Sequence, residues 1–191
     1  MSNAVAALPG TAGHIPAGPR YSRVAAWLHW AIGIALLAQI AFGFLLDTIA
    51  PRGTPERTAT INLHKSIGIV LGVLIVARIA WRLGHAAPAW PASMSPLLQR
   101  AARVGHRTLY VCMVVMPLAG YIASNFSKHG VRFFGTVLAS WGPDWPAAYT
   151  FFNGVHVVTA FVFTALIGGH VAMALKHAFV DRDGSFTRIV P

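Results

Sequence analysis

Long runs without a charged side chain are the feature that most limits what this chain can fold into. Three of them cover residues 24–46, 108–127 and 145–175, and each reaches the roughly 18–20 residues of a membrane-spanning helix. A fourth, between Lys65 and Arg78, reaches that length only if both cations lie near the membrane surfaces; the alternative is a short buried or re-entrant segment. We predict four spans, at about residues 24–49, 61–83, 106–127 and 155–179.

The composition supports a chain whose surroundings are partly hydrocarbon. Of the 191 residues, 55% are apolar and only 10% are charged, whereas soluble domains carry about 25% charged residues. We therefore predict an all-α fold, an integral membrane four-helix bundle over residues 20–191. Residues 1–19 are rich in Ala, Gly and Pro without a basic start, and we expect a flexible tail there. We also expect a short interfacial helix before the third span and a long aromatic loop over residues 128–153.

The net charge of +10 follows the spans and is not concentrated in one basic run. If there are four spans, the side that holds both termini carries ten Lys and Arg residues and the other side carries five. This bias predicts that both termini are cytoplasmic, and it favours contact with membrane lipid over nucleic acid. The single cysteine, Cys112, excludes an internal disulfide and a covalent haem attachment motif.

Histidines within the spans are the candidate functional residues, because an unpaired polar group is costly in a bilayer. His29 and His170 each lie six residues from an inner-side cation, so they are at similar depth. His64 and His156 lie at matching depth near the outer side. His156 and His170 are 14 residues apart, which places them on nearly the same helix face and about 21 Å apart.

This separation is too large for one metal ion and fits two sites, each completed by a histidine of another helix. Two imidazoles facing each other inside a helix bundle are typical of bis-histidine haem ligation. Gly33, Gly68 and Gly72 would leave room for a flat macrocycle, although they also suit close helix packing. Zinc, copper or a proton relay are alternatives, but no carboxylate lies deep in the spans to accompany the histidines.

The chain also resembles a known family, the bacterial cytochrome b561 group, and within it the superoxide oxidase branch. The resemblance covers nearly all of the chain after the tail, and its motifs in this sequence are RYSRVAAWLHW, HKSIGIVLGVLIVARIAWRL, GHRTLYVCMVVMPLAGY and HVVTAFVFTALIGGHVAMALKH. It implies a di-haem protein of the bacterial inner membrane. His29 and His170 would ligate an inner haem b, and His64 and His156 an outer one.

Further roles are implied by the same resemblance. Ubiquinone would bind beside the inner haem, where His177 matches a histidine of the quinone site. Arg78 and Arg82 match arginines that could contact haem propionates or the quinone, or could only anchor the helix. Lys65, next to His64, is the candidate for attracting an anion to the outer haem.

The expected function is transmembrane electron transfer, in which periplasmic superoxide is oxidised to dioxygen and ubiquinone is reduced. A first alternative is a cytochrome b subunit that exchanges electrons between a periplasmic redox protein or dehydrogenase and the quinone pool. A second alternative is a carrier of haem or metal without redox activity.

Overall fold

The computed structural model describes residues 20–91 and 94–191 of the chain. It consists mainly of four long helices, α1 (Arg23–Ile49), α2 (Arg57–Gly84), α3 (Pro96–Asn125) and α4 (Pro146–Leu175). All four are long and apolar enough to cross a membrane. The prediction of an all-α four-helix membrane bundle is therefore confirmed, while the predicted tail, residues 1–19, lies outside the described residues.

The third and fourth helices begin well before their predicted starts at residues 106 and 155. The Ser95 hydroxyl accepts a hydrogen bond from the Leu98 amide and caps α3, and Pro96 occupies its first turn. The expected interfacial helix is thus wrong as a separate element, because nothing between Ser95 and residue 106 breaks the hydrogen-bonded ladder. Residues 146–153, which we assigned to a loop, form the first two turns of α4, where Pro146 again suits the helix start.

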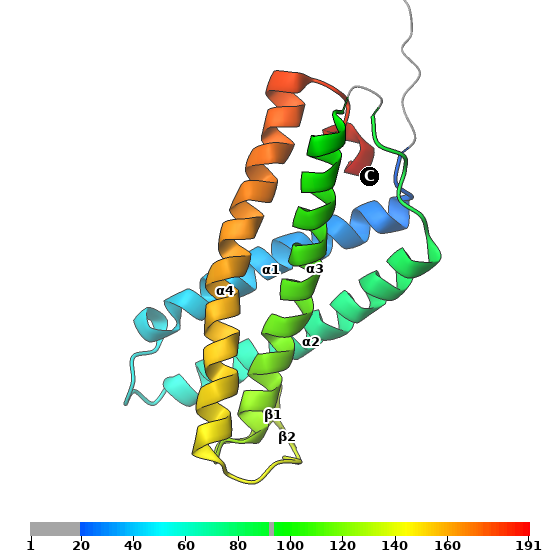
Figure 1. Cartoon of the computed structure of the whole chain (residues 1–191). Coiled ribbons are helices and arrows are strands. Elements are labelled where there is room, and N and C mark those ends of the chain that lie inside the picture. Colours follow the sequence, from blue (N-terminus) through cyan, green and yellow to red (C-terminus); the bar gives the residue numbers. More distant parts are fainter. Residues whose placement is uncertain (1–19, 92–93) are drawn as a thin grey trace, which may run out of the picture.

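The helices pack as two pairs, α1 with α2 and α3 with α4, and α2 joins the pairs by packing on α3. In Figure 1 the α1 and α2 pair passes behind α3 and α4. The centre is filled by apolar side chains, including Ile32, Ile75 and Phe163. Many outward side chains are apolar too: Val76 is 65% exposed and Phe161 is 62% exposed. Such a surface is stable when hydrocarbon surrounds it.

The bundle has two distinct ends. One end, here called the hairpin face, holds the link between α1 and α2 and a small antiparallel hairpin, β1 (Val131–Phe133) and β2 (Thr136–Leu138). Both strands lie within residues 128–153, where the sequence predicted a long aromatic loop. Its two turn residues, Phe134 and Gly135, have φ of 45° and 95°, which fits a tight hairpin turn.

The opposite end, here called the terminal face, holds the start of α1 and the C-terminus. Beyond α4 the chain continues as a π-helix, η1 (Lys176–Asp181), and a short 3₁₀ helix, η2 (Phe186–Ile189). The Trp30 indole donates to the Ile189 carbonyl at 3.0 Å, and the Arg20 guanidinium donates to the Thr187 carbonyl at 3.0 Å. The C-terminal segment is thus folded back onto α1 (Figure 1).

Candidate functional site

Two histidines face each other near the hairpin face. His64 on α2 and His156 on α4 have ring centres 6.2 Å apart, with planes at 89°. Metal–imidazole bonds of about 2.0 Å place two rings on opposite sides of one metal ion with their centres about 6 Å apart. The separation of His64 and His156 therefore matches a shared metal ion between the two rings.

One ring of this pair has its Nδ1 atom next to an acceptor, so that its Nε2 atom keeps the lone pair that a metal ion needs. His156 Nδ1 lies 2.7 Å from the Met116 carbonyl oxygen. The Gln39 amide nitrogen donates to the His64 carbonyl at 2.7 Å and lies 3.1 Å from His64 Nδ1. A ligating histidine donates the N–H of its second ring nitrogen to an acceptor, and the Met116 carbonyl is such an acceptor for His156.

Two glycines make room for these rings. A Cβ atom on Gly120 would lie 2.7 Å from His156 Nδ1, and one on Gly43 would lie 3.1 Å from the His64 ring. Only a residue without a side chain permits the approach at Gly120. Gly33, Gly68 and Gly72, which the sequence suggested would leave room for a macrocycle, are not the glycines in contact with these rings. A Cβ atom on Gly33 or Gly72 would meet nothing within 4 Å in the described part of the chain, and one on Gly68 would lie at an ordinary 3.7 Å from the Gln39 amide nitrogen.

A second pair lies near the terminal face. His29 on α1 and His170 on α4 have ring centres 6.1 Å apart, with planes at 71°. The Arg78 guanidinium lies 3.2 Å from His29 Nδ1; because arginine has no acceptor atom, it must donate this hydrogen bond. A third ring, that of His106 on α3, lies 5.3 Å from His170.

The donor set at both pairs fits haem better than zinc. Each pair presents two imidazoles at a separation that would hold one iron ion between them. Within residues 20–91 and 94–191, the only group of three or more His, Cys, Asp or Glu ligand atoms close enough for one metal ion lies elsewhere, around His177, so neither pair has the four protein ligands of a structural zinc site. The Gln39 Oε1 atom, beside the first pair, is buried without a hydrogen-bond partner.

The other predicted residues are found in three different settings. Lys65 is half-buried, and its ammonium donates to the Gly130 carbonyl at 2.8 Å; no carboxylate of the described residues pairs with it. Arg78 reaches His29 as described. Arg82 instead donates to the His85 carbonyl at 2.7 Å, at the exposed end of α2, and the structure does not bring it to either histidine pair.

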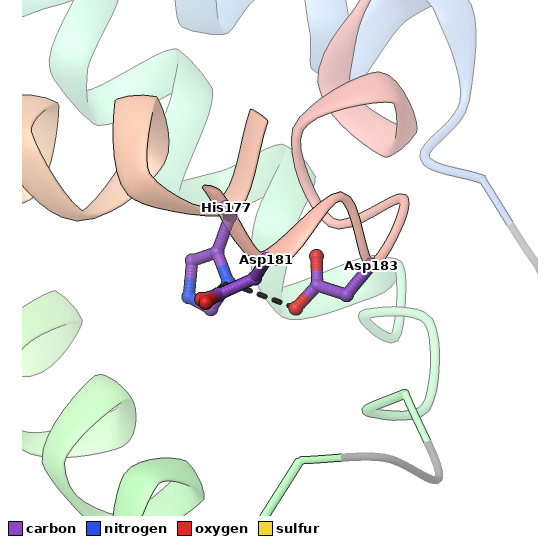
Figure 2. Close-up of side chains that lie close together, drawn as sticks. All are labelled: His177, Asp181 and Asp183. Carbon is purple, nitrogen blue, oxygen red and sulfur yellow. Dashed lines mark hydrogen bonds and ion pairs between the residues drawn. The ribbon is translucent and has the colours of Figure 1, made fainter. Parts of the chain in front are cut away.

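His177 lies in a cluster of charged residues at the terminal face (Figure 2). Its Nδ1 atom is 2.8 Å from an Asp183 oxygen and 3.2 Å from an Asp181 oxygen. The Lys176 ammonium lies 2.6 Å from each of the two oxygens of Asp181. His177 also lines a cavity of about 190 Å³ together with Arg182 and Phe186.

The Asp183 carboxyl is held in its charged form. Burial raises its pKa, but the Ser185 amide hydrogen bond and the neighbouring His177 ring outweigh that effect, so the pKa lies below the ordinary value. The donor atoms of His177, Asp181 and Asp183 lie within 4.8 Å of one another, as they would around a metal ion. Because Lys176 already compensates Asp181, hydrogen bonds and ion pairs account for the arrangement.

Sequence reasoning missed three parts of these sites. Gln39 is the lone amide in the first apolar run, which is the signal that could have indicated a buried polar contact. His106 was assigned no task, although its depth at the inner end of the third span resembles that of His170. Asp183 lies six residues after His177, and only the π-helix and the turn after it bring the two together.

Comparisons with known proteins agree with this architecture. Residues 20–191 match the family model described as prokaryotic cytochrome b561. The chain is 32% identical to "Cytochrome b561 homolog 2" of Escherichia coli (strain K12) over 176 residues, which cover 90% of this chain and 91% of that protein. It is 28% identical to "Probable superoxide oxidase CybB" of Yersinia pestis, over 90% of this chain and 96% of that one. A bundle of four apolar helices matched over nearly its whole length identifies this chain as a multi-pass membrane member of the prokaryotic cytochrome b561 family, a family of haem b proteins that transfer electrons.

Proposed function

We propose that the protein binds two b haems, one held by His64 and His156 and the other by His29 and His170. The observation that carries this proposal is that the ring centres are 6.2 Å apart in one pair and 6.1 Å apart in the other. Helix α4 contributes one histidine to each pair. The orientation of His156 by the Met116 carbonyl and the close approach at Gly120 support it. Bound haem supplies one-electron redox chemistry between iron(III) and iron(II).

The direction of transfer that fits best is from superoxide at the hairpin face to ubiquinone at the terminal face. Two superoxide anions give up one electron each and leave as dioxygen, while one quinone takes the two electrons and two protons to become quinol. The bias of Lys and Arg toward the terminal face supports a cytoplasmic position for that face in the bacterial inner membrane. The hairpin face would then meet the periplasm.

Lys65 supports an anionic donor at the hairpin face. It follows His64 directly in the chain, and its ammonium has a neutral carbonyl as its partner. A cation without a carboxylate partner attracts anions and raises their encounter rate. The name of the Yersinia pestis relative, a probable superoxide oxidase, agrees with this donor.

A second candidate donor is a periplasmic redox protein or a dehydrogenase. The observation that favours it is a group of exposed aromatic side chains at the hairpin face: Phe134 is 61%, Trp141 58% and Trp145 55% exposed. Exposed aromatic residues are common in protein interfaces. They are equally common at membrane surfaces.

The decisive experiment is reduction of ubiquinone by the purified, haem-loaded protein while superoxide is generated enzymatically. We expect quinol to form faster than with a haem-free control, and expect added superoxide dismutase to abolish the difference. No difference from the control would refute the superoxide reaction. Quinol formation only after a reduced periplasmic extract is added would favour the second candidate, and absence of reversible haem reduction would favour a carrier.

The haem assignment has its own test. His64→Ala and His170→Ala should each remove one of two haems, because each variant loses one axial ligand of a different pair. Haem content per protein and the reduced optical spectrum measure the loss. A variant that keeps both haems would overturn the pairing.

The role of Lys65 is tested by Lys65→Gln. We expect superoxide-driven haem reduction to slow by about tenfold at low ionic strength and by less at high salt, as for electrostatic steering. Lys128→Gln is the matched control, since Lys128 is exposed beside the same face. Equal rates in both variants would remove Lys65 from the proposal.

A further inference from the structure

The His177 side chain is held by a carboxylate that belongs to a different segment. His177 lies in η1, which continues α4, whereas Asp183 lies in the stretch that folds back toward α1. One Asp183 oxygen lies 2.8 Å from His177 Nδ1, and the other accepts the Ser185 amide at 2.9 Å. Both oxygens are therefore engaged, and the carboxylate is fixed from two directions.

The fold explains how the carboxylate comes to lie there. The π-helix ends at Asp181, and Arg182 turns the chain with a left-handed φ of 50°. Beyond the turn, the Trp30 and Arg20 bonds to η2 hold the segment on α1. Single π-turns within helices are frequent at functional sites. In this one, the side chains of His177 and Asp183 are directed at each other (Figure 2).

The other charged groups nearby are few in the described part of the chain. On η1 itself they are Lys176 and Asp181, which pair with each other. From the segment after η1 they are Arg182 and Arg188, and the latter donates to the Ala89 carbonyl at 2.5 Å. Along α4 the nearest titratable residue is His170, seven residues away, or about 10 Å along a helix.

We propose that Asp183 is a positioning residue for quinone reduction: it holds the Nδ1–H of His177, so that Nε2 can deliver a proton to a quinone oxygen at the terminal face. This inference rests on the proposed function, because it assigns the quinone to the cavity that His177 lines. Of the two protons that the quinone takes up, His177 supplies one and recovers it from cytoplasmic water. The electrons come from superoxide, and no bond to the protein forms.

A carboxylate on the far nitrogen performs two tasks in such a pair. It fixes the ring orientation and tautomer, and it stabilises the protonated ring. Asp183 suits these tasks better than Asp181, because it lies closer to the ring nitrogen and its side chain is 15% exposed against 28%. Asp181 also has Lys176 as a partner.

The test compares Asp183→Asn with Asp181→Asn in the haem-loaded protein. Superoxide first reduces the haems, and stopped-flow spectroscopy then follows their reoxidation by added ubiquinone. For Asp183→Asn we expect an unchanged haem spectrum and unchanged reduction by superoxide, with reoxidation slowed roughly 10- to 100-fold, by analogy with the loss of a hydrogen-bond partner from a metal-ligating histidine. The pH at which reoxidation falls off should move to lower values, because the protonated ring loses its counter-charge. Asp181→Asn should change the rate less than threefold.

Asp183→Glu keeps the charge and should recover most of the reoxidation rate. Wild-type reoxidation rates and an unchanged pH profile in Asp183→Asn would overturn the inference, as would an equal effect of Asp181→Asn. If Asp183→Asn fails to load haem, His177→Gln decides: the inference requires slow reoxidation there, and a wild-type rate overturns it. Failure of the wild-type protein to reduce quinone at all would instead refute the proposed function.

Discussion

The two histidine pairs differ in what surrounds their rings. At the hairpin face, His64 and His156 meet an amide and a backbone carbonyl, both uncharged, and a glycine lies close against each ring. At the terminal face, His29 meets the Arg78 guanidinium, and a third imidazole stands beside His170. The rings of one pair have uncharged hydrogen-bond partners, whereas in the other pair one ring contacts a guanidinium and the second has a third imidazole beside it.

This difference indicates how one bundle can serve two tasks. Positive charge near a redox centre stabilises its reduced, less positive state. The Arg78 guanidinium contacts a ring of the terminal-face pair, whereas the Lys65 ammonium is bonded to the Gly130 carbonyl, so we expect a centre at the terminal face to accept electrons more readily. Such an ordering favours transfer from the hairpin face to the terminal face, which is the proposed direction. Four experiments test this difference between the two ends of the bundle.

The largest effect should come from the choice of ligand at the terminal face. His106 lies nearer to His170 than His29 does, at 5.3 Å against 6.1 Å, yet we propose His29 as the ligand because its ring is half-buried whereas His106 is exposed. His29→Leu should remove one of two haems, and His106→Leu should remove none. Pyridine haemochrome assays measure the content. The reverse result would make His106 the ligand.

The next effect should come from Gly120. A Cβ atom there would lie 2.7 Å from His156 Nδ1, a ring that the Met116 carbonyl holds in place, so Gly120→Ala should displace the ring and lower occupancy of the hairpin-face haem several-fold. Gly154→Ala is the matched control, because nothing lies within 4 Å of its added atom. Full haem content in Gly120→Ala would show that the ring can shift without losing its ligand.

A smaller effect is expected at Arg78. Arg78→Leu removes the guanidinium that contacts His29 Nδ1. We expect the midpoint potential of one haem to fall by roughly 60 mV, which is equivalent to a tenfold change in a one-electron equilibrium. Arg78→Lys should restore part of the difference. Redox titration followed optically measures both. A rise in potential would mean that Arg78 acts by increasing the anionic character of His29.

The smallest effect concerns pH at the terminal face. The pKa of Asp183 is lower in the folded protein than its ordinary value, which is about 3.9. Its contribution to stability is therefore complete above the ordinary value and is lost as the pH falls below it, through the folded-state pKa. Amide hydrogen exchange of residues 182–191, corrected for intrinsic rates, should rise as the pH falls below about 4. In Asp183→Asn the exchange should already be fast at pH 5.

The four-helix architecture could be predicted because apolar run length alone decides whether a segment can span a bilayer. Helix ends were less predictable. The third helix begins at Pro96, not near residue 106, since an amphipathic start carries no signal that distinguishes a separate helix from a continuation. The hairpin depends on a left-handed φ at Phe134. Bulky residues rarely adopt this conformation, so a phenylalanine in the sequence does not predict it.

The histidine pairs could be predicted because depth along a helix follows from residue counting, and four polar rings in apolar runs require partners. The contacts that orient the rings could not. Gln39 and Arg78 reach His64 and His29 across helix boundaries, so they depend on rotational positions that counting does not give. Asp183 depends on a π-turn, which has no sequence signature of its own.

Helix α4 contributes one histidine to each pair, and this has a mechanical consequence. The two rings are joined by 14 residues of continuous backbone, and lengthening that distance would require breaking intrahelical hydrogen bonds. Tilting or sliding of the bundle in the bilayer therefore moves both histidine pairs together. In the proposed two-haem protein, this covalent spacer sets the distance between the haems, so changes in membrane thickness or temperature should leave that distance nearly constant.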